Sequence, residues 1–578
     1  MKDSISAIRH SLAHLLGAAV LELYPGSKLA IGPAIDDGFY YDIDVVGKIS
    51  DADLPRIETE MRKLIKTWDK FEKIKEDKDS AQSRYIGNSY KNELIQELAN
   101  KGEEITSYQS GRFTDLCRGG HVESARDINP DGFKLSHVAG AYWRGDEKNP
   151  QLTRIYGFGF ENKKELDAHI AMLEEAKKRD HKKLGPELDL FTFSDLVGSG
   201  LPLWTPRGTL LRNLLDDYVW ELRKKAGYQQ VDIPHITKKE LYEKSGHWDK
   251  FKDELFRITT REGHEFAMKP MNCPHHTQIY ARKQHSYREL PQRYANTTKV
   301  YRDEQSGELA GLSRVRSITQ DDAHVFCRHS QVKEEMGKIW DIITEFYKGV
   351  GFDLEVRLSL HDPKHQEKYL GNAETWKKSE DELRQVIRSK KAKVEEMVGE
   401  AAFYGPKIDF IGKDSLGREW QVATIQLDMN MPERFDLNCI NEKGEKERIV
   451  MIHAAIMGSL ERFLSILIEH FAGAFPVWLS PVQAIILPIS DKQNAWSKEV
   501  ADQLRRSDLR IELDDTNETL GKKIRGAELQ KIPYILVVGD KELQAGTVAV
   551  RQRGKGDLGQ VKIETFIQKI TEETAKKI

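Results

Sequence analysis

Several features that define whole classes of protein are scarce in this chain of 578 residues. Its four cysteines contain no CxxC pair, which argues against a disulfide framework and in favour of a reducing compartment. No apolar run approaches the roughly 18 residues that a membrane-spanning helix needs. The start of the chain lacks the features of a secretion signal or a transit peptide. Together these absences predict a cytoplasmic protein without a membrane partner.

An excess of charge of one sign is also missing, because 89 Lys and Arg stand against 92 Asp and Glu, for a net charge of -3. This balance excludes a histone-like or polybasic binder, so any contact with nucleic acid must use local basic patches. The chain has no repeat of about 20 to 50 residues, which sets solenoids aside. At roughly 100 to 200 residues per domain, its length predicts about three to five domains.

Composition and pattern divide the chain into four predicted parts: residues 1–160, a charged linker helix at 161–185 that stops before Gly185-Pro186, a large unit at 186–477, and a small unit at 478–578. Few strands of the large unit are separated by crossover helices, so a mainly antiparallel sheet is favoured. In the last part, strands alternate with helices, which predicts an α/β domain with a mixed sheet. The predicted fold class is therefore α+β and multidomain.

Two matched pairs of chemically active side chains lie in the first part. His10 and His14 are four residues apart, so on a helix they share one face. Cys117 and His121 repeat that spacing. One thiol and three imidazoles could complete a tetrahedral zinc site, but they could equally act as acids and bases. The spacing alone does not separate these two uses.

Two further sets lie in the large unit. Cys273, His324 and His453 supply the donors of a catalytic-type zinc site, although spacings of 51 and 129 residues exclude a zinc finger and carry little weight alone. The second set consists of arginines with apolar, strand-forming neighbours, whose planar fork suits phosphate or carboxylate. No GxxxxGK[ST] loop is present, so any nucleotide must be held by such arginines, unless they pair with local acids instead. The four arginines are Arg302, Arg314, Arg316 and Arg462.

Longer ordered motifs resemble those of the class II aminoacyl-tRNA synthetases. The segments Tyr301–Glu304 and Gly311–His324 resemble motif 2, Gly458–Phe463 resembles motif 3, and Val231–Pro234 lies where motif 1 ends. Within that class the chain is similar to the threonyl-tRNA synthetase family over essentially its whole length. Further matching segments are Lys269–Pro274, Ala402–Asp409, Thr424–Asp428 and Gly539–Glu542.

The resemblance implies an antiparallel catalytic sheet with flanking helices, a homodimer formed through motif 1, and a zinc ion on Cys273, His324 and His453. Valine is nearly isosteric with threonine, and an apolar pocket separates such pairs only about 10- to 200-fold. Zinc that accepts the amino group and the hydroxyl of threonine leaves valine unable to complete its coordination. Asp322 matches the residue that accepts from that hydroxyl. Gln320 and Gln426 match others that line the pocket, and further matching substrate-binding positions are Tyr404, Gln421, Thr424 and Ser459.

The resemblance also implies how ATP is held with Mg²⁺. Arg302 would hold the α-phosphate while the threonine carboxylate attacks it, Glu304 would contact the adenine amino group, and Arg314 would reach the γ-phosphate. Arg462 would stack on adenine, and Lys407 matches another active-site position. The protein would contribute positioning and electrostatics to an in-line displacement. The threonyl adenylate would then be attacked by the terminal ribose of tRNA(Thr).

Serine keeps the hydroxyl and lacks one methyl, so zinc cannot reject it strongly, and hydrolysis of mischarged tRNA becomes necessary. Residues 1–160 resemble the editing domain of the family, in which the pocket side chains position a water molecule. The related pocket of alanyl-tRNA synthetases holds zinc, so a metal remains an alternative here, as does a surface role for Lys91. The matching pocket residues are His10, His14, Tyr41, Lys91, Asp115, Cys117 and His121.

The last part resembles an anticodon-binding domain. From Asn517 to Lys555, eight Lys or Arg stand against four Asp or Glu, an excess that suits phosphate contact. Asn517, Glu542 and Arg551 match positions that read bases, which RNA loops splay outward.

Some positions depart from the family pattern. The chain opens directly at the editing domain, whereas the family often begins with a ubiquitin-like domain. Ile318 replaces a phenylalanine that stacks on adenine, and His275 replaces a glycine after Asn-Cys-Pro. Three competing interpretations are a regulatory protein built on a synthetase fold, a hydrolase of mischarged tRNA alone, and a prolyl or seryl enzyme. The intact motif 2 and motif 3 arginines and both sets of His and Cys favour threonine.

Overall fold

The computed structural model describes residues 2–577, which divide into two compact units, Met1–Glu175 and Ala176–Ile578. The division falls inside helix α5 (Lys163–Arg179), in the predicted linker. The predicted single helix with a stop before Gly185-Pro186 is wrong. Asp180 accepts a hydrogen bond from the Lys182 N–H at 2.8 Å and thereby caps a second helix, α6 (His181–Glu187), which continues through Pro186.

The N-terminal unit is built around helix α1 (Lys2–Leu23), whose Leu12, Leu15 and Leu16 are fully buried. The helix contacts strand β3 of an antiparallel sheet with the order β1-β3-β8-β7, in which β2 also pairs with β3. A second antiparallel sheet has the order β4-β5-β6. The other elements are β1 (Lys28–Leu29), β2 (Ala34–Ile35), β3 (Gly38–Asp44), α2 (Leu54–Thr67), β4 (Glu72–Glu76), α3 (Lys78–Arg84), α4 (Ser89–Asn100), β5 (Ile105–Ser110), β6 (Phe113–Leu116), β7 (Phe133–Tyr142) and β8 (Gln151–Gly159).

One helical segment in the described part of the chain, Ser4–Leu23 of α1, is long and apolar enough to cross a membrane. The expectation that no segment reaches this length is therefore wrong. In its most apolar window 61% of the residues are buried inside the protein, as in a core helix. The apolar composition of α1 is thus accounted for by packing within its own unit.

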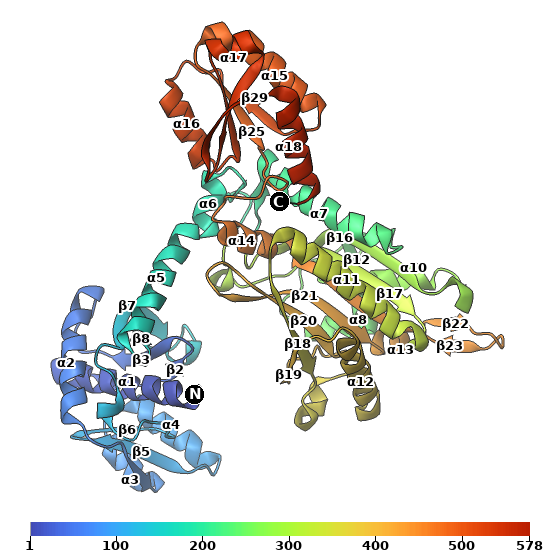
Figure 1. The fold of residues 1–578 in the computed structure, drawn as a ribbon. Helices are drawn as coiled ribbons and strands as arrows, with labels where there is room; N and C mark the ends of the chain where they lie inside the picture. Colours follow the sequence, from blue (N-terminus) through green and yellow to red (C-terminus); the bar gives the residue numbers. More distant parts are fainter. Residues whose placement is uncertain (1, 578) are drawn as a thin grey trace. The chain divides into compact units, whose positions relative to one another are not determined.

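The second unit contains an eight-stranded sheet with the order β11-β16-β17-β24-β21-β20-β18-β19, antiparallel except at its two edge pairs. This confirms the predicted mainly antiparallel sheet. Helices α7 (Pro206–Lys225), α11 (Val332–Val350), α12 (Ala373–Ser389) and α14 (Leu460–Phe471) share one hydrophobic core with it (Figure 1). The strands are β11 (Gln229–Gln230), β16 (Gln292–Tyr301), β17 (Ser317–Cys327), β18 (Leu354–Leu360), β19 (Val394–Val398), β20 (Lys407–Lys413), β21 (Glu419–Asp428) and β24 (Val450–Ser459).

The side-chain alternation of these strands gives the sheet two chemically different faces. On β17, Ala323, Val325 and Cys327 join the core beneath the helices, so Asp322 and His324 point to the opposite face. The same alternation on β20, β21 and β24 sends aliphatic residues into the core and polar ones to the open face. The sheet therefore gathers polar side chains from four strands on one surface.

The second unit also contains smaller elements. Two three-stranded sheets have the orders β12-β14-β13 and β15-β22-β23, and β9 pairs with β10. These elements are β9 (Phe191–Thr192), β10 (Leu203–Trp204), β12 (Ile236–Lys238), α8 (Lys239–Ser245), α9 (His247–Lys250), β13 (Arg257–Thr259), β14 (Glu265–Met268), α10 (Cys273–Ala281), β15 (His285–Ser286), α13 (Asn430–Arg434), β22 (Asn438–Ile440) and β23 (Lys446–Arg448).

The C-terminal part carries a mixed sheet with the order β26-β25-β27-β28-β29, as the sequence predicts. The first three strands are parallel and the last two antiparallel. Helices α15 and α18 cover one face and α16 the other (Figure 1). The elements are β25 (Ala484–Pro488), α15 (Asn494–Arg506), β26 (Ile511–Leu513), α16 (Leu520–Leu529), β27 (Tyr534–Val538), α17 (Asp540–Ala545), β28 (Thr547–Gln552), β29 (Gly556–Lys562) and α18 (Ile563–Ala575).

Candidate active site

Cys273, His324 and His453 meet on the open face of the eight-stranded sheet. Cys273 is the first residue of α10, while His324 and His453 are directly paired across β17 and β24. One potential ligand atom from each of the three lies within 4.8 Å of the others, and all three residues are buried. His324 Nε2 lies 3.1 Å from His453 Nδ1. Residues that are far apart in sequence thus form one compact donor set.

The outer ring nitrogens of this cluster have partners of their own. His453 Nε2 lies 3.0 Å from Asp428 Oδ2, and His324 Nδ1 lies 2.7 Å from His276 Nδ1. Such partners fix the orientation of metal-ligating imidazoles. Burial holds the pKa of His324 well below its usual value, which leaves the imidazole neutral and able to bind a metal. One sulfur and two imidazole nitrogens are a donor set that zinc prefers, so the cluster is compatible with zinc.

The predicted amino-acid pocket borders this cluster. Asp322 Oδ1 lies 3.7 Å from His324 Nε2, and burial raises the pKa of Asp322. The Tyr404 ring lies 5.1 Å from the His453 ring, and Gln426 is paired with His453 across β21 and β24. Gln320 belongs to β17 and is paired with Ser459 of β24. The structure thus places Asp322, Tyr404 and Gln426 beside the donors, and Gln320 and Ser459 further along the same two strands.

Asp409 on β20 organises the next part of the open face, a role that sequence reasoning did not assign. Its Oδ2 lies 2.7 Å from Lys407 Nζ. Its Oδ1 accepts hydrogen bonds from Gln421 Nε2 at 2.7 Å and from Thr424 Oγ1 at 2.9 Å. The sequence signal is alternation, because Asp409 follows Lys407 by two residues and shares its face.

Asp321 is a second residue that sequence reasoning missed. Its carboxylate lies 3.2 Å from the Arg223 guanidinium and accepts the backbone N–H groups of Ile456 and Met457 at 2.9 and 3.1 Å. The β17–β24 register shifts at this place, between Gln320 and Asp322. Burial raises the pKa of Asp321 to about 7. A buried ion pair therefore fills the bulge from which the motif 3 segment departs.

The candidate ATP residues lie around the motif 2 loop. Arg302 donates toward Met271 Sδ at 3.4 Å and lies over the Phe251 ring, while its Nε is buried without a partner. Arg314 donates from Nε to Glu304 Oε2 at 2.8 Å, so in this structure the two candidate ATP residues are paired with each other. Arg462 lies 5.9 Å above the Trp420 ring. An arriving anion would have to draw Arg314 away from Glu304.

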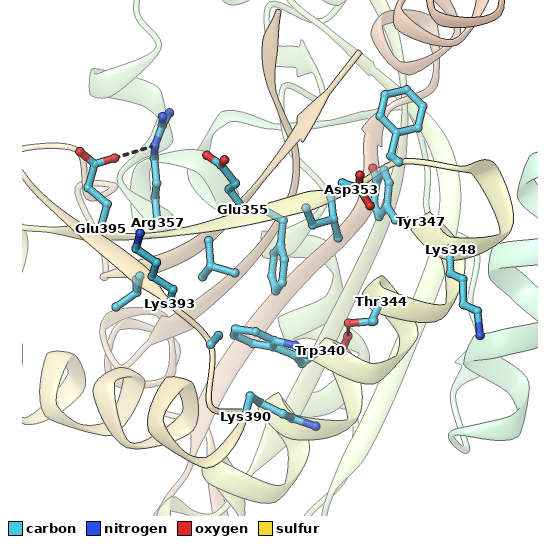
Figure 2. A pocket seen from close by; sticks show the side chains of 16 residues that line it. Trp340, Thr344, Tyr347, Lys348, Asp353, Glu355, Arg357, Lys390, Lys393 and Glu395 are labelled. Carbon is cyan, nitrogen blue, oxygen red and sulfur yellow. Dashed lines mark hydrogen bonds and ion pairs between the residues drawn. The ribbon is translucent and has the colours of Figure 1, made fainter. Parts of the chain in front are cut away.

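A cavity of about 940 Å³ lies elsewhere on the second unit. Figure 2 shows it between α11, β18 and the segment before β19, with Trp340, Lys348, Asp353 and Lys393 at its wall. No candidate residue for threonine or ATP lines it. The cavity therefore adds nothing to the site on the open face.

The second predicted cluster lies in the N-terminal unit. His10 and His14 share one face of α1, and one ligand atom each from these, Cys117 and His121 lies within 4.8 Å of the rest. Cys117 Sγ lies 3.4 Å from His10 Nε2 and 3.3 Å from His121 Nε2. Burial raises the pKa of Cys117 to about 11, so the group is a neutral thiol beside neutral imidazoles. Protonated Cys117 suits a site that positions water by hydrogen bonds.

Lys91, Asp115 and Tyr41 lie beside this cluster. Lys91 Nζ is 2.6 Å from Asp115 Oδ1, and the Tyr41 hydroxyl donates to the other carboxylate oxygen. Lys91 is 2% exposed, so the alternative of a surface lysine is wrong. His14 Nε2 lies 3.9 Å from Asp115 Oδ2. A buried charged pair thus supports the cluster from one side.

His121 makes the N-terminal unit sensitive to acid. Burial lowers its pKa to about 2, whereas an unfolded histidine titrates near 6.5. Below pH 6.5 His121 binds a proton in the unfolded chain but stays neutral in the folded protein. The free energy of unfolding therefore falls by up to about 1.4 kcal/mol for each unit by which the pH is lowered. We expect the hydrogen-exchange protection of α1 to fall from pH 6.5 to pH 5, and to fall less in His121→Phe. An equal fall in both proteins would contradict this role.

The three predicted anticodon residues lie in the C-terminal part. Asn517 is exposed in the loop before α16, and Arg551 lies on β28. Glu542 accepts the Gly539 N–H at 2.9 Å and the Gln560 side-chain amide at 2.6 Å. Both carboxylate oxygens of Glu542 are therefore engaged within the domain.

Comparisons with known proteins agree with this organisation. Residues 256–471 match the tRNA synthetase class II core domain (G, H, P, S and T), residues 483–573 match an anticodon binding domain, and residues 105–156 match the threonyl and alanyl tRNA synthetase second additional domain. The threonine–tRNA ligase of Porphyromonas gingivalis is 51% identical over 576 residues, 98% of this chain and 87% of the relative. That of Phocaeicola vulgatus is 49% identical over 578 residues, 99% of this chain and 89% of the relative.

A solved structure of the RNA binding domain of threonyl-tRNA synthetase from Cryptosporidium parvum has a TM-score of 0.65 and 36% identity, covering 68% of this chain and 98% of that one. The open-face geometry, the three matched domains and full-length identity near one half all point the same way. The chain belongs to the threonine–tRNA ligase family of class II aminoacyl-tRNA synthetases.

Proposed function

We propose that this protein activates threonine with ATP, transfers it to tRNA(Thr), and hydrolyses mischarged Ser-tRNA(Thr) in its N-terminal unit. The observation that carries the proposal is the meeting of Cys273, His324 and His453 beside Asp322 on the open face of a class II sheet. This set offers a threonine-sized substrate one metal position and one carboxylate acceptor. The division into residues 1–160, 161–185, 186–477 and 478–578 is part of the proposal.

Selection for threonine would depend on Cys273, His324 and His453 holding zinc. Zinc bound there would supply open coordination positions for the amino group and the hydroxyl of the substrate. Asp322 would accept a hydrogen bond from the threonine hydroxyl, and its buried position strengthens that hydrogen bond. Gln320, Tyr404 and Gln426 would shape the pocket around the threonine methyl. The side chains of this chain thereby distinguish an alcohol from the isosteric methyl of valine.

ATP would be held with Mg²⁺ by the arginines of motifs 2 and 3. The partnerless Nε of Arg302 leaves a donor free for the α-phosphate. Arg314 would exchange Glu304 for the γ-phosphate, which frees Glu304 to contact the adenine amino group. Arg462 would stack on adenine, with Trp420 behind it. Asp409 would hold three further side chains of the site in place by hydrogen bonds, those of Lys407, Gln421 and Thr424. Ser459 would complete the site.

Editing would use the neutral cluster of the N-terminal unit. His10, His14, Cys117 and His121 would orient a water molecule toward the ester of Ser-tRNA(Thr), while Tyr41, Lys91 and Asp115 hold the cluster in place. We infer that these side chains act on water directly, as acid, base and hydrogen-bonding groups, because they lie within hydrogen-bonding distance of one another. Asn517, Glu542 and Arg551 would read anticodon bases.

Further parts of the proposal concern assembly and location. The segment before α7 carries four exposed apolar side chains, Phe193, Leu196, Val197 and Leu203. Exposed apolar residues close together favour burial in a homodimer. A cytoplasmic location fits four free cysteines.

The proposal predicts threonine-dependent exchange of pyrophosphate into ATP by the zinc-replete protein. Serine should support weaker exchange and valine almost none, because valine offers no hydroxyl. The measurement is isotope exchange with the three amino acids at equal concentration. Equal exchange with valine would contradict zinc-based selection, and no exchange at all would favour a regulatory protein or a hydrolase.

A further inference from the structure

His181 connects the end of the linker region to the two ATP motifs within the second unit. It is the first residue of α6, and it is 4% exposed. Its Nδ1 lies 2.7 Å from Glu469 Oε1 on α14, and its Nε2 lies 3.0 Å from the backbone nitrogen of Leu312. A backbone N–H can only donate, so Nε2 accepts and Nδ1–H donates to the carboxylate.

The hydrogen bonds of this tautomer account for the closeness of three side chains that could otherwise be taken for metal ligands. Single atoms of Asp180, His181 and Glu469 lie within 4.8 Å of one another. Both nitrogens of His181 already have partners, and Glu469 Oε2 is held by Arg418 at 2.6 Å. The group is therefore a hydrogen-bonded junction and not an open set of donors.

The turn that His181 holds belongs to the ATP loop, defined here as residues 302–316 between β16 and β17. Within it, the Ala310 N–H donates to the Arg314 carbonyl at 3.2 Å. The Leu312 side chain is fully buried in the sheet core, and Ser313 Oγ lies 3.0 Å from Ser465 Oγ on α14. The turn that carries Arg314 is thus anchored to the core, to α14 and to His181.

Gly311 shows that the His181 contact is built into the backbone of this turn. Its φ is +54°, a conformation that glycine adopts without strain. A Cβ at this position would lie 2.4 Å from His181 Nε2. The close approach of the turn to the imidazole therefore requires a residue without a side chain.

Glu469 extends the junction toward the predicted adenine site. It binds the Arg418 guanidinium, and Arg418 Nε donates to Asp414 Oδ2 at 2.7 Å. The Trp420 indole N–H donates to the same Asp414 oxygen at 3.0 Å. Since Arg462 lies above Trp420, an unbroken set of contacts joins the ATP loop to the Arg462 support.

We propose that His181 is a positioning residue for ATP: it fixes the turn that carries Arg314 and links that turn, through Glu469, to the Trp420 support of Arg462. The proposal rests on the proposed use of ATP. His181 itself touches neither substrate. Its effect should therefore appear in ATP affinity and not in threonine affinity.

Two substitutions distinguish the contact made by Nδ1 of His181 from the contact made by its Nε2. In His181→Asn the side-chain amide can still donate to Glu469, but it is too short to reach Leu312. In His181→Gln the longer carbonyl can accept from the Leu312 N–H, while Glu469 keeps only its contact with the backbone N–H of residue 181. A buried donor without a partner is costly, so we expect His181→Asn to raise the KM and the Kd for ATP about tenfold. His181→Gln should restore most of that loss, with kcat and the threonine KM little changed.

The chain contains a matched control. His181 contacts Glu469 from its backbone N–H at 3.3 Å as well as from Nδ1, and His361 contacts Glu380 in the same way, from its backbone N–H at 3.2 Å and from Nδ1 at 2.6 Å. Within residues 2–577 its hydrogen bonds involve Glu380 alone, so His361→Asn removes a comparable imidazole without touching the ATP loop. This control should leave the Kd for ATP unchanged.

The measurements are pyrophosphate exchange kinetics, calorimetric binding of ATP, and hydrogen exchange of peptides covering residues 310–314. A higher Kd for ATP and faster hydrogen exchange of residues 310–314 in His181→Asn, but not in His181→Gln, would support the proposal. If both variants only lower the thermal midpoint and keep the Kd for ATP, the proposal is overturned. If the unmodified chain binds ATP but exchanges no pyrophosphate, the proposed ligase function fails while the His181 comparison of ATP binding still decides this inference.

Discussion

Replacing Cys273 by serine is expected to abolish threonine activation and to release bound zinc. A serine hydroxyl is not deprotonated at neutral pH, so it replaces thiolate poorly as a zinc ligand. Loss of a single hydrogen-bonding partner of a metal ligand already costs about 10- to 100-fold in metal affinity or activity. Loss of the ligand itself should therefore lower threonine-dependent exchange by more than about 100-fold.

Cys439→Ser is the matched control for Cys273→Ser. Cys439 is also buried, and it lies on β22 outside the donor set. Both variants and the unmodified protein should be purified identically and compared by elemental analysis and by pyrophosphate exchange. The assignment of Cys273 predicts loss of zinc and exchange in that variant alone. Full zinc content in Cys273→Ser would show that other residues hold the metal.

ATP binding provides a further separation of effects. Cys273 lies among the threonine-selecting residues, whereas Arg302, Arg314 and Arg462 are proposed to hold ATP. The Kd for ATP alone should therefore change by less than about threefold in Cys273→Ser, which corresponds to less than 1 kcal/mol of binding free energy. A parallel loss of ATP binding would indicate that the whole open face had rearranged.

The polar face of the catalytic sheet could be predicted from alternation and motif resemblance. His324 and Asp322 are two residues apart on one strand, so they share a face once the strand is recognised. Cys273 offers no such signal, because it begins a helix 51 residues away from His324. Only the resemblance could pair it with two histidines, and the fold supplies the physical reason in the packing of α10 against β17.

Other features depend on long-range register, which local pattern does not contain. The bulge at Asp321 arises where β24 holds extra residues opposite β17, and it is filled by an arginine from α7. The break of the linker at Asp180 depends on a side-chain cap, and composition predicted one continuous helix instead. Residues that pair across elements, such as Arg223 with Asp321, are visible only in three dimensions.

The editing proposal makes the second large prediction. His10→Ala should lower hydrolysis of Ser-tRNA(Thr) by about 10²- to 10⁴-fold, the range expected when a positioned acid or base group is lost. His10 Nε2 lies 3.4 Å from Cys117 Sγ, and its ring stacks on His121 with 4.3 Å between centroids. Removing the imidazole therefore takes away one of the groups that can orient water, while the buried Lys91–Asp115 pair remains.

The measurement is release of serine from preformed Ser-tRNA(Thr), together with threonine-dependent pyrophosphate exchange on the same sample. Exchange should be unchanged in His10→Ala, because the donors for threonine belong to a separate unit of the chain. His137→Ala is the matched control, since His137 is an exposed histidine of the same unit that stacks on Tyr156. Equal serine release by His10→Ala and His137→Ala would remove His10 from the hydrolytic site. If release is lost only in His10→Ala while exchange is intact, hydrolysis and activation reside in different units, as the two separate clusters of His and Cys imply.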